Sequence, residues 1–179
     1  MAVVIHLSDV RRQCAVRDGF AAWSRHFGRT FGDETGLRDL EPRVLKRLAS
    51  PGEDATHLIN ALIIGFIGRG DGTAFETLDL QDRSRIVDLQ LFMADQIHFE
   101  MMTRLGWLAG YGGRDDGLYA MIRQADACRL HYQKHPPCLS PSFPSYGEYA
   151  ALIERDKQVF IRRLIPAALQ AFGEASDHE

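Results

Sequence analysis

One segment near the middle of the chain constrains the fold more than any other, because residues 78–105 contain neither glycine nor proline. The segment is rich in Leu, Met, Gln, Arg and Ala, which are favourable residues in a helix. Gly106 is an isolated glycine near its end, and Gly110, Gly112 and Gly113 follow, where they favour backbone that does not continue a helix. The sequence therefore predicts a long helix that starts at about Leu80 or Gln81, runs to about Leu108 and is closed by Gly110, Gly112 and Gly113.

Further helices are indicated by their end signals. Ser-x-x-Glu capping boxes begin at Ser50 and Ser145, and Pro42 is suited to a first helical turn. Pro166 is expected to kink or split the last helix, because it lacks a backbone N–H. The expected helices cover residues 8–27, 41–48, 51–67, 115–134 and 145–172.

A proline-rich stretch separates the last helix from the others. Residues 135–147 hold four Pro and three Ser, which predicts an irregular loop. Residues 2–5 could form a strand, but no partner strand is evident for it. The predicted fold is all-α: a single domain over residues 1–179, built as a bundle of five or six helices with a Pro-rich loop before the last one.

Charge and apolar content exclude several partner classes. The chain has 21 Lys and Arg against 24 Asp and Glu, a formal net charge of -3, so it offers no overall positive field for nucleic acid or an anionic membrane. The longest apolar run, residues 58–67, is shorter than the roughly 20 residues that span a bilayer. Residues 1–7 lack the basic start of a signal peptide, and the three Cys are an odd count. We expect a cytoplasmic protein with reduced thiols and no nucleic-acid or membrane partner.

Polar side chains fall among apolar ones on the long helix. At about 100° per residue, Asp88, Asp95 and His98 share an arc with large apolar side chains, which predicts that they are partly buried. Gln96 and Glu100 fall on a different arc, which we interpret as the solvent face.

The last helix shows a similar pattern, since Glu154 and Lys157 project into its apolar arc. One interpretation is an internal ion pair to the long helix, or charged stems that reach water at the edge of the core. The other is a polar pocket that holds a metal ion or a ligand. The candidate pocket residues are Asp88, Asp95, His98, Glu154 and Lys157.

A second candidate site holds four possible zinc ligands, Cys128, His131, His135 and Cys138. Each neighbouring pair has acceptable zinc spacing. Cys128 and His135 are roughly 10 Å apart along a continuous helix, however, so a single tetrahedral site requires the helix to end before His135. The alternative is a helix end whose His side chains face solvent and complement the helix dipole.

The motifs G-x-S-x-G, Walker A, G-x-G-x-x-G and H-E-x-x-H are all missing. The leading hypothesis is therefore a small interaction or regulatory protein without catalysis. The alternative is a helical-bundle enzyme or cofactor binder that uses Asp95, His98 and Glu154, with Asp88 and Lys157 behind them. Aromatic and sulfur side chains surround the long helix on almost every side, which predicts either a central core helix or a homodimer interface.

Overall fold

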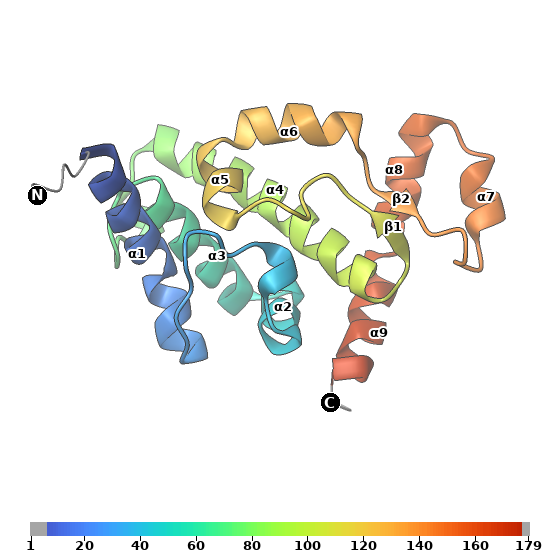
Figure 1. The fold of residues 1–179 in the computed structure, drawn as a ribbon, viewed down its shortest axis with the longest axis horizontal. Coiled ribbons are helices and arrows are strands. Elements are labelled where there is room, and N and C mark those ends of the chain that lie inside the picture. The colour runs from blue at the N-terminus through green and yellow to red at the C-terminus, as the bar shows by residue number, and fades with distance from the viewer. Residues whose placement is uncertain (1–6, 177–179) are drawn as a thin grey trace, which may run out of the picture.

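The computed structural model describes residues 7–176, which are mostly helical. These residues contain nine α-helices, the 3₁₀ turns η1 (Leu37–Asp39) and η2 (Phe75–Thr77), and one two-stranded sheet (Figure 1). The helices are α1 (Leu7–Phe27), α2 (Pro42–Ala49), α3 (Glu53–Phe66), α4 (Leu80–Arg104), α5 (Leu118–Arg123), α6 (Ala125–Lys134), α7 (Tyr146–Ala150), α8 (Glu154–Arg163) and α9 (Ile165–Ser176). None of the helices in this described part is both long and apolar enough to cross a bilayer.

The mostly helical fold is confirmed, but five or six helices was too few because two predicted helices are divided. The segment over 115–134 breaks at Gln124, whose backbone (φ −118°, ψ 31°) is not helical. The last segment forms three helices, with extended backbone at Ile153 and a second break next to Pro166. Pro166 has no N–H to donate to the preceding turn, which explains the second break.

The Pro-rich segment is not the wholly irregular loop that was predicted. Its residues Cys138–Leu139 form β2, which pairs antiparallel with β1 (Leu108–Gly110) beyond the end of α4. Ser140 extends the link by donating its N–H to the carbonyl oxygen of Trp107, at 2.8 Å. This pairing fixes the segment that follows α6 against the end of α4. The strand considered for residues 2–5 lies outside the described residues.

The long helix α4 is the central element of the molecule (Figure 1). It begins at Leu80, as predicted, because the Asp79 side chain accepts a hydrogen bond from the Asp82 N–H at 2.8 Å. It ends at Arg104, earlier than the predicted end at about Leu108, because Gly106 has a positive φ of 72° that leaves the helical path, and Leu108–Gly110 form a strand instead. Helices α2, α3 and α9 and strand β1 all pack against it.

The predicted solvent face of α4 was wrong. Glu100 has 0% exposure and Gln96 6%, whereas Leu91, from the predicted apolar arc, is 66% exposed. The loop after α4 covers the Glu100 side of the helix through Tyr111 and Arg114.

Three donors surround the buried Glu100 carboxylate. Arg104 Nε lies 2.8 Å from one oxygen, and Tyr111 Oη and Arg114 Nε lie 3.0 and 3.3 Å from the other. Arg104 also donates to the carbonyl oxygens of Leu37, Arg38 and Leu40. A buried carboxylate is stable only when it is paired, and these donors supply the pairing. Since they come from different segments, the network also joins α4 to the segment around η1 and to the loop after β1.

Candidate functional site

The structure does not assemble the predicted five-residue pocket. Only Asp95 and Glu154 line a common cavity. Asp88 faces outward and pairs with Arg129 at 2.7 Å, and Lys157 lies 3.4 Å from Glu154, with its ammonium 5.7 Å from the Tyr149 ring. Glu154 and Lys157 thus pair with each other at the edge of the core, and the ion pair that joins the last part of the chain to the long helix is made by Arg162 and Asp95.

His98 points away from that cavity. Its Nε2 lies 3.2 Å from the carbonyl oxygen of Ala49, on α2, so this nitrogen donates the hydrogen bond. The side chain is half-buried, and burial lowers its pKa below the ordinary value. His98 therefore joins two helices and cannot act together with Glu154.

The four candidate zinc ligands are not brought together either. The Cys128 thiol points back toward the Ala120 carbonyl, 3.9 Å away, while the Cys138 thiol lies 3.4 Å from the Pro136 carbonyl, beyond the end of α6. The rings of His131 and His135 are adjacent, with centroids 5.1 Å apart, and both side chains are exposed. Burial raises the pKa of the Cys128 thiol, which opposes the thiolate form that binds zinc.

Over residues 7–176, no group of three or more His, Cys, Asp or Glu side chains has an arrangement that could hold a metal ion. The expected helix end with solvent-facing histidines is what the structure contains.

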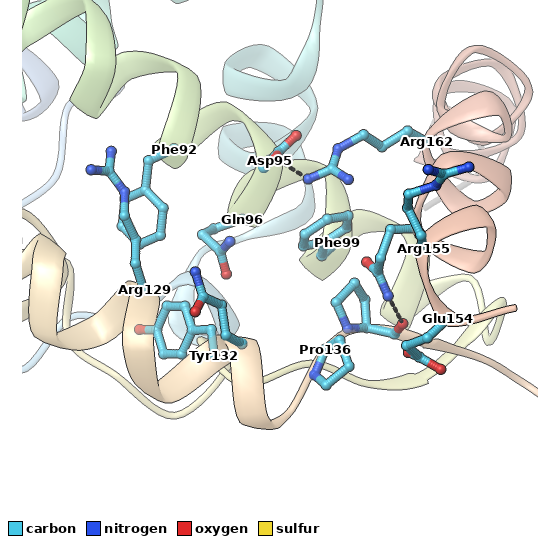
Figure 2. Close-up of a pocket in the computed structure, with 13 residues that line it drawn as sticks. Phe92, Asp95, Gln96, Phe99, Arg129, Tyr132, Pro136, Glu154, Arg155 and Arg162 are labelled. Atoms are coloured by element: carbon cyan, nitrogen blue, oxygen red, sulfur yellow. Dashed lines mark hydrogen bonds and ion pairs between the residues drawn. The ribbon is translucent and has the colours of Figure 1, made fainter.

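A cavity of about 430 Å³ lies between α4, α6 and α8, and this is the candidate site (Figure 2). Its volume is within the range of roughly 300–1,000 Å³ that is typical of small-molecule pockets. We call it the three-helix cavity. Its lining residues are Phe92, Asp95, Gln96 and Phe99 from α4, Arg129, Tyr132 and Gln133 from α6, Pro136 and Pro137 after α6, and Glu154, Arg155, Gln158 and Arg162 from α8.

Aromatic rings form the apolar walls. Phe92 and Tyr132 stack with centroids 5.9 Å apart and planes 16° from parallel, and Phe99 lies farther along α4 (Figure 2). The Tyr132 hydroxyl donates to Asp116 at 2.6 Å, which holds the ring in place. Burial, together with Asp116, raises the pKa of Tyr132, so its hydroxyl stays protonated.

Arginines surround the mouth of the cavity. The Arg129 guanidinium lies 4.9 Å from the Phe92 ring centroid, and that of Arg162 lies 5.9 Å from the Phe99 centroid. Arg162 also pairs with Asp95 at 2.7 Å, which connects α8 to α4 across the cavity. Arg155 is the most exposed of the three, with 86% of its side chain accessible and a 3.4 Å contact to Asp156.

Gln96 supplies the most deeply buried polar group of the lining. The residue is 6% exposed and lines the cavity, and its amide is not one of the buried polar atoms without a partner, which within residues 7–176 are Asn60 Oδ1 and Arg83 Nε. Gly113 lies against it, because a Cβ at that position would meet Gln96 Oε1 at 2.5 Å.

The sequence analysis did not identify most of this site. The spacing of Phe92, Gln96 and Phe99, four and three residues apart, places them on one helix face and could have marked a wall of the cavity. The contributions of α6 and α8 had no such signal, since they depend on how those helices pack. Comparison with protein-family models, with curated proteins and with solved structures finds no match. The class that the fold and site define is a helical protein with an amphipathic cavity between α4, α6 and α8.

Proposed function

We propose that this is a small-molecule-binding protein without catalysis, which takes an organic ligand with a flat apolar part in the three-helix cavity. The observation that carries the proposal is the cavity itself, with rings of Phe92, Phe99 and Tyr132 as walls and arginines around its mouth. Pockets of this kind bind ligands through apolar contact and a few well-placed polar groups.

The titratable groups of the lining support binding more than catalysis. Asp95 is paired with Arg162, Glu154 with Lys157, and the Tyr132 hydroxyl with Asp116. The competing hypothesis of a metal- or cofactor-dependent enzyme required His98 beside Asp95 and Glu154, and His98 lies against α2 instead.

A regulatory role for ligand binding is suggested by the contacts that attach α8 to the other two sides of the cavity. Across the cavity, Arg162 pairs with Asp95, and Gln158 donates to the Pro137 carbonyl at 3.3 Å. A ligand between these groups would add contacts that join α8 to α4 and α6, and would favour the arrangement of helices that binds it. We place this activity in the cytoplasm, without nucleic-acid or membrane partners, on the sequence arguments alone.

Titration with anilinonaphthalene sulfonate, an anion that carries a flat naphthalene ring, tests this proposal. Isothermal calorimetry is expected to show one saturable site. Phe92→Ala removes one wall and should weaken binding about fivefold, which corresponds to about 1 kcal/mol of aromatic contact.

Leu130→Ala is the matched control, because Leu130 is an exposed apolar residue of α6 that does not line the cavity. It should leave the affinity unchanged. No saturable binding, or an equal effect of both variants, would overturn the proposed function.

A further inference from the structure

A second cavity lies between α1, the end of α3 and α5. Its volume is about 570 Å³, and its lining includes Arg11 and Arg12 from α1 and Arg123, the last residue of α5. We call it the α1–α5 cavity. It shares no lining residue with the three-helix cavity, so a ligand bound here would be independent of the proposed function.

Two arginines of the α1–α5 cavity are left without a partner. Within residues 7–176, neither Arg11 nor Arg123 makes an ion pair, a hydrogen bond or a ring contact, and both residues are exposed. Asp18, the carboxylate of the lining, is already paired with Arg17 at 3.0 Å. The cavity is therefore flanked by two positive charges, from two different helices, that no carboxylate of the described chain neutralises.

The same cavity has apolar walls. Val10 is 40% exposed, and Ile67 and Tyr119 are partly buried against the core. The Tyr119 ring lies 5.6 Å from the Arg12 guanidinium, which Asp33 holds at 3.0 Å. Apolar walls beside unpaired charges favour a ligand that has both an apolar part and an anionic group.

The number of unpaired charges selects the kind of anionic group. A phosphate monoester carries about −1.5 to −2 charges at pH 7 and three strong acceptor oxygens, so one group can neutralise two guanidinium groups. Hydrogen bonds between arginine and phosphate are also among the stronger ones in proteins. A carboxylate or a sulfate ester carries a single charge and would leave either Arg11 or Arg123 without a counter-charge.

We propose that the α1–α5 cavity binds an organic phosphate monoester with an apolar body, and that its phosphate contacts both Arg11 and Arg123. Because these arginines belong to α1 and α5, the bound phosphate would also join the two helices. The apolar body distinguishes this ligand from free phosphate, which would use only the arginines.

Calorimetric titration with phenyl phosphate at low ionic strength, where screening is weak, tests the contact with the arginines. The unchanged protein is expected to bind one equivalent. Arg11→Ala and Arg123→Ala should each weaken binding at least about fivefold. Arg163→Ala is the matched control, because Arg163 is also exposed and without a partner in the described chain but lies on α8, outside the lining. No saturable binding, or an equal effect of all three substitutions, would overturn the proposal.

Two related anions test the ligand class. Phenyl sulfate has the same ring and three terminal oxygens but a single charge, and should bind at least about fivefold more weakly than phenyl phosphate. Inorganic phosphate lacks the ring and should also bind more weakly. Equal binding of phenyl sulfate would contradict the charge argument, and equal binding of inorganic phosphate would show that the site holds an oxyanion only.

The cysteines report where the ligand binds. Cys14 lines the α1–α5 cavity and is exposed, whereas the exposed Cys138 lies in β2. Saturating phenyl phosphate should slow the modification of Cys14 by N-ethylmaleimide, followed by mass spectrometry, and leave the rate at Cys138 unchanged. It should also leave the affinity for anilinonaphthalene sulfonate unchanged, because that probe is expected in the other cavity. Unchanged modification of Cys14, or competition with the probe, would place phenyl phosphate elsewhere and contradict the inference without affecting the proposed function.

Discussion

Two side chains on α4 show how burial and pairing decide the state of a polar group. Glu100 is fully buried, and its side chain accepts hydrogen bonds from two arginines and a tyrosine hydroxyl. His98 is half-buried with a single carbonyl partner, and burial lowers its pKa. Protonation of His98 would place a new charge in a partly buried position, where the nearby Asp95 carboxylate, already paired with Arg162, offsets it only in part.

We expect His98 to make the protein less stable in mild acid. Its folded-state pKa lies below the ordinary 6.5, so as the pH falls the unfolded chain takes up this proton first. The contribution of His98 is therefore complete above about pH 6.5 and is lost as the pH drops toward the folded-state pKa. Urea unfolding at about pH 7.5 and about pH 5.5 measures this loss.

His98→Gln removes the titrating group, and the decrease in unfolding free energy between the two pH values should become smaller. His57→Gln, at an exposed position of α3, should leave the decrease as it is. The same decrease in His98→Gln as in the unchanged protein would show that His98 is not responsible.

At the scale of elements, the closest helix contact joins α1 and α3. The two helices meet at Gly19 and Gly65, where a Cβ on Gly65 would lie 2.3 Å from the Gly19 Cα. On either side of this point, Phe20, Trp23 and Phe66 form an aromatic cluster. The absence of side chains at the crossing is what allows these rings to interlock.

Gly65→Ala is expected to reduce the free energy of unfolding by about 3 kcal/mol. The added Cβ would overlap the backbone of Gly19, and the backbone cannot rotate away as a side chain can, so the two helices would have to move apart. Urea denaturation checks the value. Gly147→Ala provides the comparison: Gly147 lies in α7 with nothing within 4 Å of an added Cβ. This second change should be neutral or stabilise by up to about 1 kcal/mol, since Ala is the better helix former. Similar effects of the two substitutions would contradict the tight crossing.

At the scale of the whole molecule, the apolar side chains around α4 are largely used within one chain. Met93, Phe99, Met101 and Met102 are buried, and Phe92 and Trp107 pack against the same core. The homodimer stays a prediction, and on α4 it now depends on Val87 and Leu91, which are exposed four residues apart.

Sedimentation velocity at micromolar concentration is expected to give twice the chain mass. Leu91→Asp should shift the protein to a monomer, because a charge on that face opposes its burial. A monomer in the unsubstituted protein would end the prediction.

The sequence by itself determined where most helices begin and end. Local signals such as Pro42, the Asp79 position and the glycines after α4 act within one or two turns, and the structure places helix ends beside them. Even here the two predicted capping boxes were wrong: Ser50 does not cap α3 and donates its hydroxyl to the Lys46 carbonyl at the end of α2, and Ser145 precedes α7 without a side-chain cap hydrogen bond.

Only the tertiary structure decided which face of α4 is buried and which side chains share a cavity. The periodicity of α4 is weak because neighbours surround it, so Gln96 and Glu100 are read as exposed until the loop after β1 is seen to cover them. The cavity brings α4 together with α6 and α8. Both of these helices begin more than 20 residues after α4 ends, and the β2 segment lies between them in the sequence. Contacts between segments so far apart depend on how whole elements pack, and a local sequence pattern does not predict that packing.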